Sequence, residues 1–148
     1  MEKKLKVELE GILDNQGLAR AIAAAYVTEF DPTVDELTEI KTAVSEAFSN
    51  AALHGYGEDA ECIVKPVIME FSSLSKDTIM IKITDRGKGI ENIARAMEPL
   101  FTTDTGSNRS GMGFTVMESF TDRLKVDSVP GKGTTVTMIK KLDTYYGF

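Results

Sequence analysis

Apolar and polar residues alternate with a period of two in several stretches of the chain, and this alternation is typical of β-strands with one buried face. Strands are predicted at 4–10, 61–71, 78–85, 123–128 and 134–141. Pro66 lies inside the second stretch and cannot donate a ladder hydrogen bond. We therefore expect that strand to lie at an edge of the sheet or to be bulged there.

Helical spacing of apolar residues predicts two long helices between the first two strands. The first helix begins near Asp14 and Asn15, which offer capping oxygens. Its expected apolar positions are Leu18, Ala21, Ile22, Ala25, Tyr26 and Phe30. The second starts at Asp31-Pro32, with Asp31 as N-cap, and ends around His54-Gly55. Shorter helices are expected at 91–97 and 112–120.

Two pairs of predicted strands follow each other directly along the chain. This order favours an α+β fold, a mixed and largely antiparallel sheet with helices on one face. The length of 148 residues suits a single domain spanning 1–148. With 42% apolar and 27% charged residues, the composition is that of an ordinary globular protein.

The net charge of -6 argues against a protein that binds nucleic acid through its phosphates. No apolar run reaches the roughly 18–20 residues of a membrane span, and the first residues lack the apolar core of a signal peptide. The single Cys62 permits no intramolecular disulfide, and one cysteine with one His54 makes no zinc cluster. We expect both to be packing residues, and the protein to be cytoplasmic.

Candidate chemistry begins on the second long helix, at Glu46 and Asn50. Four residues apart, the two side chains share one helix face. The Asn50 oxygen suits Mg²⁺, and the Glu46 carboxylate could deprotonate an attacking hydroxyl or water. Alone, E-x-x-x-N is commonly a solvated polar stripe.

The segment D-R-G-K-G-I, residues 85–90, follows a predicted strand. Asp85 at the strand end can accept a hydrogen bond from an exocyclic amine of a base. Gly87 and Gly89 allow the backbone to approach a ligand closely, because neither has a Cβ. Such a loop is often no more than a tight turn.

The segment R-S-G-M-G-F, residues 109–114, precedes a predicted helix. Gly111 and Gly113 open that helix, whose free N–H groups can bind phosphate, although the G-K-[ST] of a Walker loop is missing. Arg109 could neutralise charge on a terminal phosphate. The polar stretch 99–110 before it is expected to form a mobile lid. Together with Glu46 and Asn50, these segments predict a nucleotide site.

The order of these segments resembles the GHKL (Bergerat-type) ATP-binding fold, with residues 46–50 as the N box and 85–90 and 109–114 as the glycine boxes. Within that superfamily the chain resembles bacterial anti-sigma factors with serine-kinase activity, most closely those of sporulation. The matching stretches are D-P-T-V-D-E-L-T-E-I-K-T-A-V-S-E-A, N-A-A-L-H-G-Y, P-L-F-T-T and R-S-G-M-G-F-T-V-M-E-S-F.

The resemblance implies a homodimer that, with Mg-ATP, sequesters a sporulation sigma factor of the sigma F type. It also implies phosphorylation of a serine on an anti-anti-sigma protein. In this role Glu46 is the catalytic base, Asn50 the magnesium ligand and Asp85 the adenine contact, with Thr134 nearby. Arg20 matches a position that contacts both protein partners.

The chain departs from the family pattern in the lid, at 104–108, and at Gln16, where an acidic residue is more usual. Three other functions stay open: a general-stress anti-sigma kinase of the sigma B type, an ATP-gated sigma-binding module without significant kinase activity, and a histidine-kinase catalytic domain. Glu46 argues against the second, because a pure binder needs no base. The third has little support, because no segment resembles a phospho-accepting helical hairpin.

Overall fold

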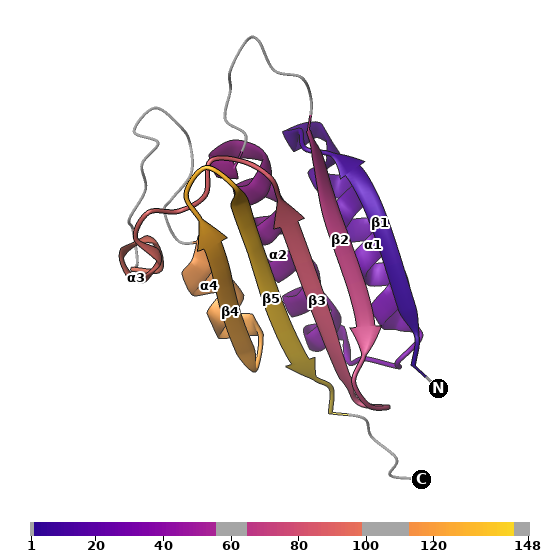
Figure 1. The fold of residues 1–148 in the computed structure, drawn as a ribbon. Helices are drawn as coiled ribbons and strands as arrows, with labels where there is room; N and C mark the ends of the chain where they lie inside the picture. The colour runs from indigo at the N-terminus through magenta and orange to yellow at the C-terminus, as the bar shows by residue number, and fades with distance from the viewer. Residues whose placement is uncertain (1, 56–64, 99–112, 144–148) are drawn as a thin grey trace, which may run out of the picture.

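The computed structural model describes residues 2–55, 65–98 and 113–143. In this part of the chain five strands form one sheet in the order β1-β2-β3-β5-β4 (Figure 1). They are β1 (Lys4–Glu10), β2 (Pro66–Ser73), β3 (Thr78–Asp85), β4 (Arg123–Val129) and β5 (Gly133–Lys141). All neighbouring strands are antiparallel, so within these residues the sheet is not mixed.

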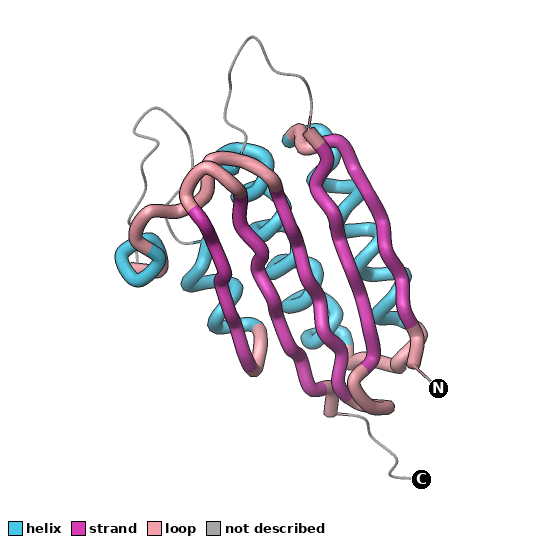
Figure 2. The backbone as a smooth tube through the Cα atoms, in the orientation of Figure 1, coloured by secondary structure: helices cyan, strands magenta, loops and turns pink. Residues whose placement is uncertain are grey.

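Helices cover one face of the sheet, and among the described residues the other face carries no helix (Figures 1 and 2). They are α1 (Gln16–Thr28), α2 (Val34–Asn50) and α4 (Gly113–Phe120), and α2 lies between the other two and contacts both. Short turns of helix complete the fold: η1 (Leu13–Asn15), the π-helical η2 (Ala51–Gly55) and α3 (Ile93–Ala96). The predicted α+β architecture, with its helices on one face, is confirmed.

The start of α2 differs from the prediction, because Thr33 is the N-cap. The Thr33 hydroxyl accepts from the Glu36 N–H at 3.1 Å, and the Glu36 carboxylate accepts from the Thr33 N–H at 2.8 Å. This reciprocal capping box satisfies two N–H groups at the helix start. Asp31 lies before it with a φ of 51°. The pattern T-V-D-E was the overlooked signal.

The expectation for Pro66 is also wrong. β2 lies between β1 and β3, so it is an interior strand. Pro66 is its first residue and pairs with Glu10, so its missing N–H falls at the end of the ladder, where it disrupts little. Residues 61–64 of the predicted strand lie outside the described residues.

The buried face of α1 is turned relative to the predicted one. Its buried residues are Ala19, Ala23, Tyr26 and Val27, whereas Leu18 is 49% exposed. The Asn15 side chain makes no cap hydrogen bond, and its amide donates to the Glu10 carbonyl at 2.9 Å. The alanines on this face allow α1 and α2 to approach each other closely.

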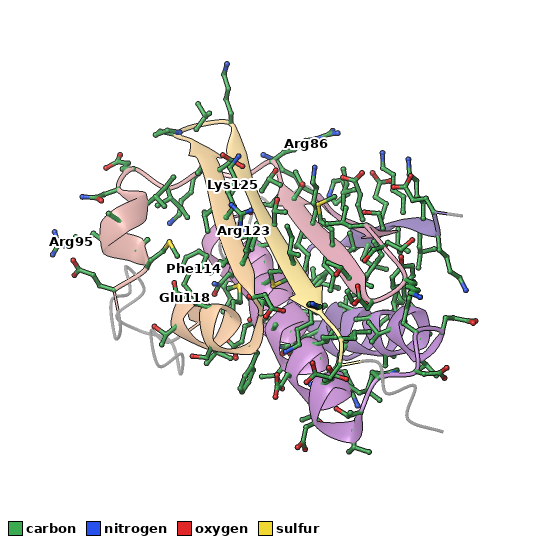
Figure 3. All side chains as sticks on the ribbon, turned by 90° about the horizontal axis from the view of Figure 1, so that it is seen from below. Arg86, Arg95, Phe114, Glu118, Arg123 and Lys125 are labelled. Atoms are coloured by element: carbon green, nitrogen blue, oxygen red, sulfur yellow. The ribbon has the colours of Figure 1, made fainter. Side chains whose placement is uncertain are left out.

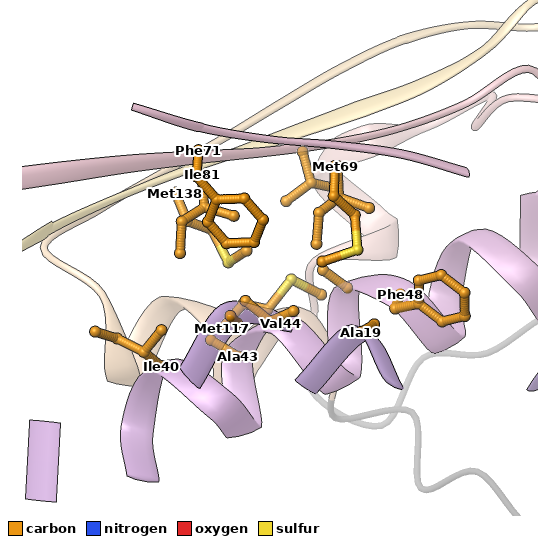
Figure 4. Close-up of a cluster of buried hydrophobic side chains, with 14 of the residues drawn as sticks. Ala19, Ile40, Ala43, Val44, Phe48, Met69, Phe71, Ile81, Met117 and Met138 are labelled. Carbon is orange, nitrogen blue, oxygen red and sulfur yellow. The ribbon is translucent and has the colours of Figure 1, made fainter. Parts of the chain in front are cut away.

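The hydrophobic core fills the space between the sheet and the helices (Figure 4). Phe71 and Met138 reach into it from the sheet, and Phe48 and Met117 from the helices, each at most 1% exposed. Because α2 and α4 are both anchored in this core, their polar ends are held in fixed positions relative to the sheet.

Candidate functional site

Glu46 and Asn50 lie half-buried in the last turns of α2, beside the first residue of α4. A Cβ placed on Gly113 would lie 2.9 Å from Asn50 Nδ2, 3.2 Å from Asn50 Oδ1 and 3.3 Å from Glu46 Oε2. The structure thus brings these three predicted site residues together. Glycine at 113 lets the start of α4 approach the polar end of α2 without a side chain in between.

The start of α4 adds a partial positive charge beside Glu46 and Asn50. The free N–H groups and the dipole of a helix N-terminus favour anions. Here they stand next to an amide and a carboxylate on α2. Gly111 and Arg109, with the predicted lid at 99–110, lie outside the described residues.

Asp85 is the last residue of β3 and is 6% exposed. Burial raises the pKa of its carboxyl to about 6, although hydrogen bonds from the N–H groups of Gly87 and Thr134 act in the opposite direction. The Gly87 N–H donates to Asp85 Oδ1 at 2.9 Å. Thr134 is the residue directly opposite on β5 and is likewise buried. The predicted neighbourhood of Asp85 and Thr134 is therefore present.

The loop after Asp85 is packed tightly against the turn between β4 and β5. Gly89 has a φ of 75°, and a Cβ there would lie 2.4 Å from the Val129 carbonyl oxygen. The Gly131 N–H donates to the Lys88 carbonyl at 2.6 Å. Gly89 is thus required by its backbone and by its neighbours. Arg86 projects from the sheet face that has no helices (Figure 3).

The pair of Asp85 and Thr134 lies at the same end of the domain as the cluster of Glu46, Asn50 and Gly113. Figure 1 shows the end of β3, the end of α2 and the start of α4 there. The π-helical turn η2 continues α2 and contacts β3. A ligand that meets Asp85 with one end and the start of α4 with the other would therefore lie along this end.

Arg20 is exposed on α1, and a Cβ on Gly17 would lie 3.9 Å from its Nη2. One turn earlier, the Gln16 amide donates to the Ser45 carbonyl at 3.1 Å. This bond fixes the start of α1 to α2, next to Glu46. Sequence reasoning noted Gln16 only as a departure from a family pattern, because such a contact depends on how two helices pack.

The donor set suits a magnesium ion that is held mainly by its nucleotide. Within 2–55, 65–98 and 113–143 there is no group of three or more His, Cys, Asp or Glu side chains arranged to hold a metal. Mg²⁺ typically takes only one or two protein oxygens and fills its other positions with water and phosphate. Asn50 Oδ1 beside the start of α4 fits this role. The side chains of His54 and Cys62 lie outside the described part.

The Asp85 carboxyl is expected to titrate near pH 6 in the nucleotide-free chain, whereas an exposed aspartate titrates at about 3.9. Between these values the folded chain holds a proton that the unfolded chain has released. Asp85 therefore lowers the free energy of unfolding as the pH rises through this interval. The ¹³C chemical shift of the carboxyl measures the midpoint of this titration. Asp85→Asn should abolish both the titration and its contribution to the pH dependence of the free energy of unfolding. A midpoint near pH 4 would contradict the burial argument.

Solved structures share this fold, among them the following two. The RsbU and RsbW domains of a Mycobacterium tuberculosis protein align with a TM-score of 0.69 and 18% identity, over 95% of this chain and 32% of that one. The histidine kinase domain of a blue-light activated kinase from Erythrobacter litoralis aligns with a TM-score of 0.54 and 18% identity, over 86% and 61%. At 18% identity the two structures show the class of fold alone, which is that of a histidine kinase domain.

Sequence relatives narrow this class. Residues 12–140 match the family described as histidine kinase-like ATPase domain. An anti-sigma F factor of Clostridium perfringens strain 13 is 46% identical over 97% of this chain and 100% of its own length. One of Lysinibacillus sphaericus is 44% identical, over 97% and 96%. The chain therefore belongs to the histidine kinase-like ATPase family and, within it, to the anti-sigma F factors.

No helix in the described residues has the length and apolar character needed to cross a membrane.

Proposed function

We propose that this chain is an ATP-dependent anti-sigma factor that sequesters a sporulation sigma factor of the sigma F type and phosphorylates a serine of an anti-anti-sigma protein. The name shared by relatives at 44–46% identity supports the choice of partners. The observation that carries the enzymatic part is the contact of Gly113 with Glu46 and Asn50. This supports the proposal because Glu46, the proposed base, and Asn50, the proposed magnesium ligand, both lie beside the helix start that is proposed to bind phosphate.

In the proposed reaction the Glu46 carboxylate takes the proton from the serine hydroxyl as its oxygen attacks the γ-phosphorus. The bond from that phosphorus to the bridging oxygen breaks, and ADP leaves. Asn50 holds the magnesium ion that neutralises the phosphates, and the N–H groups at the start of α4 bind phosphate oxygens. The proposal also gives Gly111 and Arg109, which lie outside the described residues, a role in binding the phosphates.

The adenine end of the nucleotide is assigned to Asp85, whose carboxylate would accept a hydrogen bond from the exocyclic amine. Gly87 is proposed to let the base approach the backbone, Gly89 to shape the same loop through its close packing on the turn between β4 and β5, and Thr134 lies beside the carboxylate. We propose further that the chain works as a single domain spanning 1–148, as a homodimer and in the cytoplasm, without binding nucleic acid or membranes.

The fate of the γ-phosphate tests the enzymatic part. Purified protein is incubated with γ-labelled Mg-ATP and a lysate of its host, beside Glu46→Gln. Label on the serine of one small protein, with the parent chain only, is the expected result. Label released only as phosphate, or no transfer at all, would reject the kinase and leave an ATPase or an ATP-gated sigma binder. The identity of the co-purified sigma factor distinguishes the sigma F from the sigma B type.

The variant Arg20→Ala is expected to bind ATP like the parent chain and to bind the sigma factor on the order of tenfold or more weakly. Arg20 is exposed on α1, and arginines are frequent hot spots of protein interfaces. Arg123→Ala is the control, because Arg123 is exposed on β4 (Figure 3). Surface plasmon resonance in saturating Mg-ATP measures the sigma affinity of both variants and of the parent chain. Equal sigma affinity for all three chains would mean that Arg20 is a solvated surface charge with no part in sigma binding.

A further inference from the structure

Three polar residues form a row across the sheet at the nucleotide end. Asp85 on β3 pairs with Thr134 on β5, and Thr134 pairs with Ser128 on β4. Directly opposite residues of antiparallel strands point to the same face. The carboxylate and the two hydroxyls therefore lie in one line on the face that the helices cover. Ser128 has no role in the proposed function so far.

The Ser128 hydroxyl has three partners. Its Oγ accepts from the Ile90 N–H at 2.7 Å, donates to the Gly133 carbonyl at 3.0 Å and lies 2.8 Å from Thr134 Oγ1. A serine hydroxyl has one proton and two acceptor positions. The carbonyl can only accept, so it takes the Ser128 proton. Thr134 must then be the donor in the contact between the two hydroxyls.

This assignment fixes what Thr134 can offer a ligand. Because its only proton is directed to Ser128, the Thr134 hydroxyl has only lone pairs left for other partners. Beside it the Asp85 carboxylate also accepts, once it is ionised. The pair of Asp85 and Thr134 therefore suits a group with N–H donors, such as the amine of adenine, and disfavours the carbonyl oxygen that guanine carries at that position.

The same hydroxyl fixes the position of the glycine loop. Its bond to Ile90 holds the end of segment 85–90, and its bond to Gly133 holds the start of β5. The contact of Gly131 with Lys88 at 2.6 Å joins the same two segments a few residues away. Removal of the Ser128 hydroxyl leaves the Ile90 N–H without this acceptor, and leaves Thr134 free to turn its proton elsewhere.

We infer that Ser128 is a positioning residue of the nucleotide site, which holds Thr134 as a hydrogen-bond acceptor and thereby favours adenine over guanine nucleotides. The inference rests on the proposed binding of ATP at Asp85. Ser128 acts through Thr134 and the glycine loop, and its effect should appear in affinity and base selectivity.

The test compares Ser128→Ala, Ser128→Thr and Ser72→Ala with the parent chain. Threonine keeps the hydroxyl and suits a strand. Ser72 is the matched control, a half-buried strand serine on β2 opposite Lys4. Isothermal titration calorimetry gives the dissociation constants for Mg-ATP and Mg-GTP, and thermal unfolding without nucleotide reports on the fold.

Ser128→Ala is expected to weaken ATP binding about three- to tenfold, the range of one hydrogen bond, and GTP binding by less. Ser128→Thr and Ser72→Ala should retain the affinities of the parent chain. Unchanged ATP affinity of Ser128→Ala would overturn the inference, as would equal losses for ATP and GTP. If the parent chain itself binds neither nucleotide, the proposed function fails, and the inference fails with it.

Discussion

Glu46→Gln is expected to bind Mg-ATP as tightly as the parent chain and to phosphorylate its protein substrate about 10²–10⁴-fold more slowly. Glutamine has nearly the size of glutamate but cannot take up the serine proton. Glu46 lies at the end of α2 beside the start of α4, so the change leaves intact the backbone that is proposed to bind the phosphates. The variant should therefore separate binding from transfer.

Asn50→Ala is expected to have the opposite defect. It removes the proposed magnesium ligand one turn along the same helix face, and affinity for Mg-ATP should fall on the order of a hundredfold. Magnesium-free ATP should bind this variant and the parent chain similarly, because the assignment concerns only the metal. Calorimetry with and without magnesium, together with transfer of labelled phosphate, measures both effects.

Asp35→Asn is the matched control for this pair, because it removes an exposed carboxylate from the first turn of α2. It should leave binding and transfer unchanged. Equal Mg-ATP affinity of Asn50→Ala and the parent would remove Asn50 from the metal site. Full transfer activity in Glu46→Gln would mean that another group accepts the proton.

The sequence predicted the elements of this fold because local pattern and tertiary burial agree in most of them. In β3 every second residue is buried, as the alternation indicated. The positions of the candidate residues Glu46, Asn50 and Asp85 could be anticipated for the same reason. Glu46 and Asn50 share one face because they are four residues apart on a helix, and Asp85 is the last residue of a strand. None of these three positions depends on distant parts of the chain.

The errors arose where two local signals competed or where a neighbouring element decided the outcome. Asp31-Pro32 and the capping box at Thr33 both mark a helix start, and the box has two reciprocal hydrogen bonds in its favour. The buried face of α1 is set by its packing on α2. Ser128 was missed because its place beside Thr134 depends on the register of β4 on β5, which one sequence does not contain.

Gly133→Ala is expected to lower the free energy of unfolding by more than about 4 kcal/mol, a large part of the roughly 5–15 kcal/mol of a typical domain. Gly133 has a φ of 126°, and a Cβ there would lie 2.1 Å from the Asp85 carbonyl oxygen and 2.8 Å from the Arg86 Cα. Both neighbours are backbone atoms, one in the last residue of β3 and one in the residue that follows it, so relief of the clash requires separating the end of β3 from β5 beside Asp85.

Gly131→Ala in the same turn isolates the steric part of this effect. Gly131 has a φ of 80° but no atom within 4 Å of a Cβ placed there, so alanine should cost only the backbone strain of about 1–2 kcal/mol. Urea unfolding of both variants and the parent chain measures the difference. Similar losses for the two variants would mean that β3 and β5 can separate at Asp85 without penalty. Asp85 and Thr134 face each other beside Gly133, where β3 pairs with β5. The fraction of Gly133→Ala that still folds should therefore also bind nucleotide more weakly than Gly131→Ala.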